Sequence, residues 1–221
     1  MSQPDNIPNS MKSDDESRRA GRPRGFDVDQ ALESAMTVFW EKGYEGASLD
    51  DLTRGMGINR PSLYAAFGNK ESLFRKVLDR YLDRFGARMQ TALGRPTARE
   101  SVEALLMGVI EVSEPGTPRG CLLVQGALCG GDSVEPIRLE LASRRKALEA
   151  RLRVRFEQAH EAGEWLPGGA SDLARYFSTV LHGLAVQSAG GADRAELAPV
   201  VDLALRAWPR QGGKAGGGAG D

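Results

Sequence analysis

The sequence has little cysteine, little histidine and no long apolar run. Of its 221 residues only 2 are cysteines and 2 are histidines, too few for a disulfide framework, and neither pair has the spacing of a metal site. No apolar stretch approaches the roughly 20 residues that a membrane-spanning helix needs. The first residues also lack the apolar middle of a secretory signal. We therefore expect a cytoplasmic protein in a reducing compartment, with no membrane partner.

Strand patterns and an excess of charge of one sign are missing as well. No β-branched or aromatic run alternates polar and apolar residues, so we expect an all-α fold. The net charge is -1, which gives the chain no overall attraction to nucleic acid. A composition of 41% hydrophobic and 27% charged residues suits one or two small domains with a sizeable core.

The residues of a catalytic centre are not recognisable either. The sequence shows no nucleophile with a base, no paired carboxylates, no phosphate-cradling loop and no metal cluster, so we predict no enzyme, no metal and no cofactor. Cys121 is a candidate redox sensor beside Arg119, but a buried thiol is the favoured alternative. On a continuous helix Cys129 would lie about 12 Å away, too far for a disulfide. Structural roles are expected for His160 and His182, although His182 could line a pocket.

Helix starts are clearly marked in the first half. Four residues are placed to cap successive helices: Asp27, Ser48, Asn59 and Asn69. Gly43 is expected to end the first helix and Gly57 to form the turn after the second. Pro61 fits the first turn of the third helix, where its missing N–H costs nothing.

The second half shows helical periodicity between turn clusters. After the breaker at 94–96 we expect helices at about 97–112, 118–130, 134–163, 170–190 and 194–208. We expect four parts in the chain: a disordered basic arm at 1–25, domains at 26–90 and 91–210, and a Gly-rich tail at 211–221.

Two short helices joined at Gly57, with another helix before them, predict a helix-turn-helix unit. In such units the second helix of the pair lies in the major groove and its first residues face base edges. Leu63 and Phe67 would then face the core. The residues expected to face DNA are Asn59, Arg60, Pro61, Ser62 and Tyr64.

The run from Phe26 to Tyr81 resembles the DNA-binding domain of the TetR/AcrR family of bacterial transcriptional repressors. The matching positions are Ala35, Phe39, Gly43, Tyr44, Ser48, Leu49, Leu52, Gly57, Ile58, Leu63, Tyr64, Phe67, Lys70, Glu71 and Leu73. The resemblance implies that Ser48, Tyr64 and Lys70 bind phosphate and that 59–62 read bases. It also implies that domain 91–210 forms an effector pocket and a dimer interface.

Chemistry supports base reading by the third helix, because arginine bonds guanine bidentately and asparagine prefers adenine.

Before the first helix, Arg22 and Arg24 lie in a stretch that resembles an AT-hook core, and a narrow minor groove attracts arginine. The alternative for this arm is a solvated tail.

We therefore expect a homodimeric repressor that an unidentified small-molecule effector releases from a pseudo-palindromic, double-stranded operator. The alternatives are a constitutive or architectural DNA binder without effector, and a ligand-responsive activator. Packing within one chain is the alternative for the apolar strip expected to form the dimer. That strip is Leu173, Phe177, Val180, Leu181, Leu184, Leu197, Val200, Val201, Leu203, Leu205 and Trp208.

Overall fold

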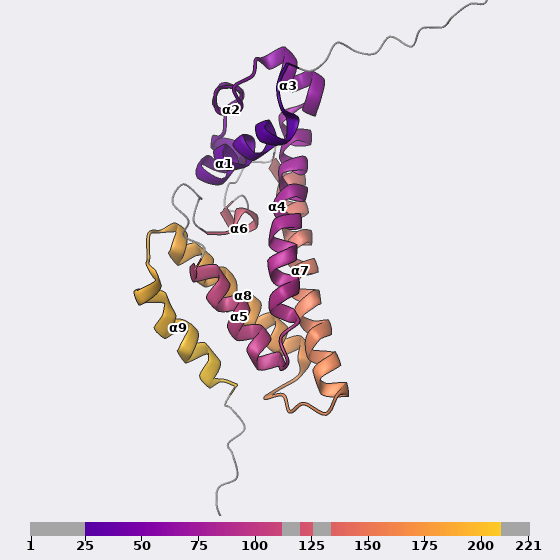
Figure 1. The fold of residues 1–221 in the computed structure, drawn as a ribbon, viewed down its shortest axis with the longest axis vertical. Coiled ribbons are helices and arrows are strands. Elements are labelled where there is room, and N and C mark those ends of the chain that lie inside the picture. The colour runs from indigo at the N-terminus through magenta and orange to yellow at the C-terminus, as the bar shows by residue number, and fades with distance from the viewer. Residues whose placement is uncertain (1–24, 112–119, 126–133, 209–221) are drawn as a thin grey trace, which may run out of the picture.

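The computed structural model describes residues 25–111, 120–125 and 134–208, and these form helices and no strand (Figure 1). The predicted all-α fold is confirmed. The helices are α1 (Val28–Gly46), α2 (Leu49–Met56), α3 (Arg60–Phe67), α4 (Lys70–Leu93), α5 (Ala98–Glu111), α6 (Leu122–Gln125), α7 (Glu135–Glu161), α8 (Ala170–Ala189) and α9 (Arg194–Arg206). No helix in these ranges combines the length and apolar character needed to cross a bilayer.

The four predicted caps are all present. The side chains of Asp27, Ser48, Asn59 and Asn69 accept hydrogen bonds from backbone N–H groups in the first turns of α1 to α4. Each cap satisfies a donor that the helix itself leaves unpaired. Short helices such as α2 and α3 need this most, because so few of their own backbone bonds hold them.

The predicted glycine breaks are also found. Gly57 has φ 65° and ends α2. Gly43 has φ 69° and ψ 174°, so the helix that we expected to end there does break, but α1 then continues to Gly46. A left-handed φ is a conformation that glycine adopts without steric cost.

The molecule has two hydrophobic cores. The first lies at the top of Figure 1, where α1 to α4 surround Phe39 and Phe74, whose ring centroids are 4.8 Å apart. Leu122 of α6 and Ile137 at the start of α7 join this core. The early part of α7 therefore belongs with the N-terminal helices in packing, although it lies far from them in sequence.

The second core fills the lower bundle of α5, α7, α8 and α9 together with the end of α4 (Figure 1). Phe156, Phe177 and Trp208 form an aromatic cluster there, with centroid separations between 5.5 and 6.4 Å. Phe85 on α4 and Leu148 on α7 pack against both cores. These two long helices therefore connect the two ends of the molecule.

The helix predicted at 118–130 is wrong at its start. Gly120 has φ +93°, and a Cβ at that position would lie 2.8 Å from Cβ of Ala189. The backbone is therefore not helical there, and α6 begins only at Leu122. The stretch 126–130 and Cys129 lie outside the described residues.

Most of the predicted dimer strip packs inside its own chain. Eight of its residues are buried: Leu173, Phe177, Leu181, Leu184, Leu197, Val201, Leu205 and Trp208. Val180 packs partly against the same core. Only Val200 and Leu203, with relative exposures of 45% and 63%, are left on the surface as large apolar side chains.

Candidate nucleic-acid interface

Helix α3 has one buried and one exposed face, as predicted. Leu63 and Phe67 are buried, whereas Arg60, Pro61 and Tyr64 are exposed. Tyr64 is 49% exposed although it is aromatic. An exposed arginine and tyrosine on a short helix form a surface suited to bases and phosphates.

The turn before α3 fixes the orientation of that face. After Gly57, the N–H of Ile58 donates to the carbonyl of Thr53 at 3.1 Å, and Oδ1 of Asn59 accepts from the N–H of Ser62 at 2.9 Å. The amide oxygen of Asn59 is thus already in use, and Ser62 is half-buried. Within the predicted base-reading segment, Asn59, Arg60 and Pro61 are exposed, and of Asn59 only the amide nitrogen is left free of the cap.

Arg60 is held by an acidic residue of α2. Its Nε and Nη2 donate to Oδ1 of Asp50 at 3.2 and 2.8 Å, and this carboxylate raises the pKa of the guanidinium further. Both side chains are exposed, at 54% and 66%. A guanine would have to replace Asp50 on Arg60. Asp50 has no signal of this role in the sequence, because only the turn between α2 and α3 brings it to Arg60.

The other two predicted phosphate contacts lie at helix N-termini near α3. At Ser48, the N–H and Oγ–H both donate to Oδ2 of Asp51, at 3.1 and 2.7 Å. Lys42 contacts the other oxygen of Asp51 at 2.7 Å, and hydrogen bonds from Lys42 and Ser48 lower the pKa of this carboxyl well below its ordinary value. The hydroxyl of Ser48 can therefore donate to a phosphate only after its hydrogen bond to Asp51 is broken.

Lys70 lies at the start of α4 over an aromatic ring. Its Nζ is 4.7 Å from the centroid of the Tyr44 ring and donates to the carbonyl of Glu45 at 3.4 Å. Partial burial lowers the pKa of this ammonium group. The Tyr44 ring holds the ammonium group of Lys70 near α3, and this group still has N–H donors to spare. It is therefore suited to contact a phosphate.

Arg22 and Arg24 lie outside the described residues. The described chain begins at Gly25 and Phe26, and these two residues line a hollow of about 320 Å³ with Asn59 and Ser62. Phe26 also packs near Phe67, at a centroid distance of 6.4 Å. The chain therefore enters the fold directly beside α3.

A second candidate site is a pocket of about 140 Å³ between the two ends of the molecule. It is lined by Met36, Trp40, Tyr81, Arg84, Phe85, Arg88, Met89, Ala92, Ala104, Leu105, Gly108, Val109, Gly120, Cys121, Leu148, Leu181, His182 and Ala185. Of these residues only Cys121 and His182 were predicted candidates for a functional role, because the lining comes from distant segments that no sequence spacing relates.

Three polar side chains lie inside this pocket: Tyr81 is buried, and Cys121 and His182 are half-buried. Tyr81 donates its hydroxyl to Sγ of Cys121 at 3.4 Å, and burial raises the pKa of that thiol. The thiol is thus held neutral, as a buried cysteine rather than a reactive thiolate. Burial lowers the pKa of His182. Within the described ranges, no three His, Cys, Asp or Glu side chains gather closely enough to hold a metal ion.

Comparison with known proteins agrees with this geometry. The family model of bacterial regulatory proteins, tetR family, matches residues 31–77. The chain is 35% identical over 195 residues to the HTH-type transcriptional repressor ComR of Escherichia coli, a match that covers 86% of this chain and 92% of ComR. It is 30% identical over 196 residues to the repressor BdcR of the same organism, covering 88% and 95% of the two chains.

A solved structure of similar fold carries DNA. It is a cysteine mutant of the TetR family transcriptional regulator CifR complexed with 26-bp double-strand operator DNA. It matches with a TM-score of 0.81 and 44% identity, over 86% of this chain and 100% of that one.

Proposed function

We propose that this chain, which belongs to the TetR family of bacterial regulatory proteins, is a homodimeric repressor that leaves a pseudo-palindromic operator when a small-molecule effector binds. The family resemblance read from residues 26–81 is confirmed, and the chain is a DNA-binding transcriptional regulator. The proposal has further parts: the homodimer, the effector, the individual DNA contacts, the absence of catalytic activity and a cytoplasmic location.

One observation carries the DNA contacts. Helix α3 exposes Arg60, Pro61 and Tyr64, while α2 and α4, the helices before and after it, each begin at a capped N-terminus. Helix N-termini present N–H groups and positive dipole ends to phosphates. In the proposal α3 enters the major groove and 59–62 read bases, while Ser48, Tyr64 and Lys70 bind the backbone.

The arm also belongs to the proposal. The chain enters beside α3 at Gly25 and Phe26, so Arg22 and Arg24 start close enough to reach an adjacent minor groove. We assign 26–90 to DNA binding and 91–210 to effector binding and dimerisation, with 1–25 as arm and 211–221 as tail.

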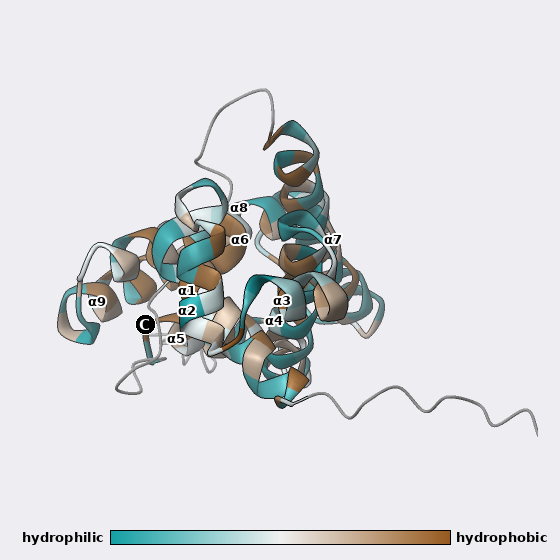
Figure 2. Cartoon of the chain, turned by 90° about the horizontal axis from the view of Figure 1, so that it is seen from above, coloured by the Kyte–Doolittle hydropathy of each residue, from teal (hydrophilic) through white to brown (hydrophobic). Residues whose placement is uncertain are grey.

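Apolar side chains on α8 and α9 support the homodimer. Val186, Val200 and Leu203 are exposed at 44%, 45% and 63%, and α9 lies at one margin of the molecule with nothing outside it among the described helices (Figure 2). In the proposal a second copy covers these side chains and sets the separation of two α3 helices to about 34–36 Å, one turn of DNA.

The pocket supports an effector. It is lined by Trp40 of α1 and Phe85 of α4 as well as by α5 and α8, so a bound molecule would touch both the DNA-binding end and the bundle. If the effector binds better when the two α3 helices have another separation, DNA and effector oppose each other through one equilibrium.

The experiment is selection of bound duplexes from a random DNA pool, with wild type, Arg60→Ala and Tyr64→Phe. Arg153→Ala is the control, because Arg153 is an exposed arginine on α7 that pairs with a carboxylate, Glu157, as Arg60 does with Asp50, but lies far from α3. We expect a two-fold symmetric site that Arg60→Ala relaxes at one position, at a cost of about 1–3 kcal/mol for the preferred base. Tyr64→Phe should weaken all sequences alike.

No enriched site would favour an architectural binder without sequence preference, and the same relaxation in Arg153→Ala would contradict base reading by Arg60. The dimer is tested separately by sedimentation of Leu203→Glu, in which the introduced charge should split the pair. A dimer that persists unchanged in this variant would place the interface elsewhere.

A further inference from the structure

The pocket between α1 and α4 has apolar walls and a positively charged rim. Trp40 and Tyr81 line it with ring centroids 5.0 Å apart in an edge-to-face arrangement, and Met36 and Phe85 lie beside them. Aromatic and sulfur-containing walls bind an apolar or aromatic body without demanding hydrogen bonds.

The charged groups at this pocket all have the same sign. Arg84 and Arg88 line it, and none of the described lining residues is an aspartate or glutamate. Arg88 has no carboxylate within ion-pair distance in the part of the chain that the structure describes. Arg145 and Glu149 of α7 both act electrostatically on His182, with opposite signs, so the positive charge of the rim comes from Arg84 and Arg88. Such a rim attracts an anion and repels a cation.

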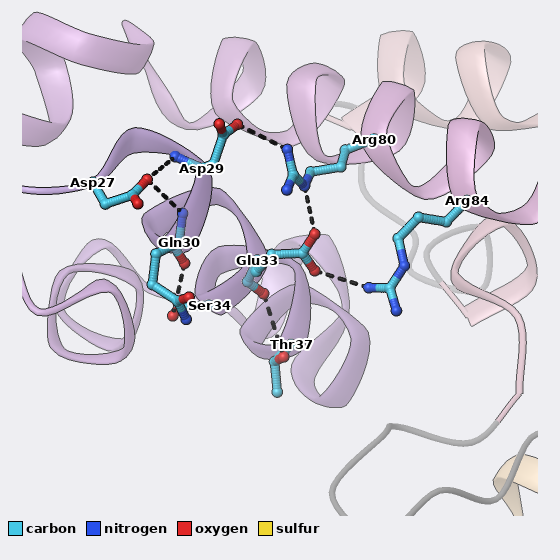
Figure 3. A network of polar contacts seen from close by, with 8 residues as sticks. All are labelled: Asp27, Asp29, Gln30, Glu33, Ser34, Thr37, Arg80 and Arg84. Carbon is cyan, nitrogen blue, oxygen red and sulfur yellow. Dashed lines mark hydrogen bonds and ion pairs between the residues drawn. The ribbon is translucent and has the colours of Figure 1, made fainter.

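Arg84 also belongs to an ion-pair network that fastens α1 to α4 (Figure 3). Its Nη1 contacts Oε2 of Glu33 at 2.9 Å. The other oxygen of Glu33 accepts from Nε of Arg80, and Nη1 of Arg80 contacts Asp29 at 2.8 Å. If the Arg84 side chain moved away from Glu33, Glu33 would still be paired with Arg80. Releasing Arg84 therefore leaves no carboxylate without a partner, and the exchange costs little.

We propose that this pocket takes a small amphipathic carboxylate, an apolar or aromatic body with one acid group, which replaces Glu33 on Arg84. The body lies against the touching rings of Trp40 and Tyr81, and the acid group takes over one of the contacts that hold α1 to α4. The regulatory part of this inference rests on the proposed function: the exchange loosens the first helix of the DNA-binding end from α4.

Calorimetry on the full chain without DNA tests the ligand class. Two matched pairs serve as probes, octanoate with octanol and phenylbutyrate with phenylbutanol. We expect at least one acid to bind about tenfold more tightly than its alcohol, the difference that one charged hydrogen bond supplies. Equal affinities within both pairs would overturn the inference.

Three variants assign the contact. Arg84→Gln should remove the preference for the acid and leave binding of the alcohol intact, which also shows that the pocket is still formed. Glu33→Gln should strengthen binding of the acid several-fold, because Arg84 loses its internal competitor. Arg80→Gln is the matched control: Arg80 bonds the same Glu33 but does not line the pocket, and its loss should keep the preference. A preference that survives Arg84→Gln would overturn the assignment.

A separate measurement on DNA distinguishes the two proposals. Anisotropy of a labelled operator is followed while the acid is added. If the acid releases DNA from wild type but not from Arg84→Gln, the result supports both the proposed function and the ligand inference. An acid that binds as expected and leaves DNA affinity unchanged supports the ligand class and contradicts its role as effector, since equal affinity for both states shifts nothing.

Discussion

The two ends of this molecule are stabilised in different ways. At the DNA-facing end, α2 and α3 are short, each is capped by a side chain, and a glycine turn joins them. In the bundle, α7 and α8 are long and begin without a side-chain cap, and an aromatic cluster around Phe156 and Trp208 fills the space between helices. Both ends have a core built from distant segments, but only at the first end do caps and a glycine turn orient two short helices.

The difference fits the roles that we propose for the two ends. Caps and turns set the direction of a few exposed side chains, which a base-reading surface requires. Packed long helices that share one pocket change arrangement together, which effector binding requires. Phe85 and Leu148 pack against both cores, so the two ends are coupled and not independent.

The largest expected effect comes from the bundle core. Phe156→Ala removes a fully buried ring that contacts Phe177 and Trp208, and it should lower the free energy of unfolding by about 3–5 kcal/mol. Urea unfolding followed by circular dichroism measures this loss. Val154→Ala on the same helix is the control, since Val154 is exposed, and a loss as small as that of the control would contradict the packing described.

A cap at the DNA-facing end should matter less. Asn69→Ala removes the acceptor for the N–H of Ser72, now at 2.7 Å, and should cost about 1 kcal/mol in the same urea experiment. Asn69→Asp keeps an acceptor oxygen and should restore most of the stability. Equal losses in both variants would mean that the cap is not what stabilises α4.

Breaking the ion pair between Asp50 of α2 and Arg60 of α3 should have a smaller effect, and a favourable one. Asp50→Asn frees Arg60 and removes a negative charge beside the expected phosphates, so DNA affinity should rise by up to about fivefold. Fluorescence anisotropy of a labelled operator measures it. Asp202→Asn makes the same charge change on the exposed side of α9, and the comparison fails if both variants bind DNA alike.

The smallest expected effect is the pH response of the bundle. Burial holds the pKa of His182 below its ordinary value of 6.5, so the unfolded chain takes up this proton before the folded one does. The contribution of neutral His182 to the free energy of unfolding should therefore be fully present above about pH 6.5. It should be lost as the pH falls from there through the pKa of His182 in the folded protein. Urea midpoints at several pH values should show a shallower fall in His182→Gln. An identical fall in both proteins would assign the response to other groups.

Much of the DNA-facing end was predictable because its signals are local. Ser48 caps α2 as expected, with Asp51 three positions on completing a capping box, and Gly57 takes the left-handed conformation that the turn needs. The buried and exposed faces of α3 follow from the spacing of Leu63, Phe67 and Tyr64. The ion pair between Asp50 and Arg60 was not predictable, because it depends on the angle between two helices.

The sequence by itself determined the all-α fold, the caps, the helix-turn-helix unit and the family, since each depends on residue types a few positions apart. Only the tertiary structure decided which apolar residues of α8 and α9 pack inside the chain and which stay exposed. It alone also brought Trp40, Arg84 and His182 around one pocket. The physical reason is that burial and pocket formation depend on contacts between segments far apart in the chain, and periodicity within one helix cannot specify its partner.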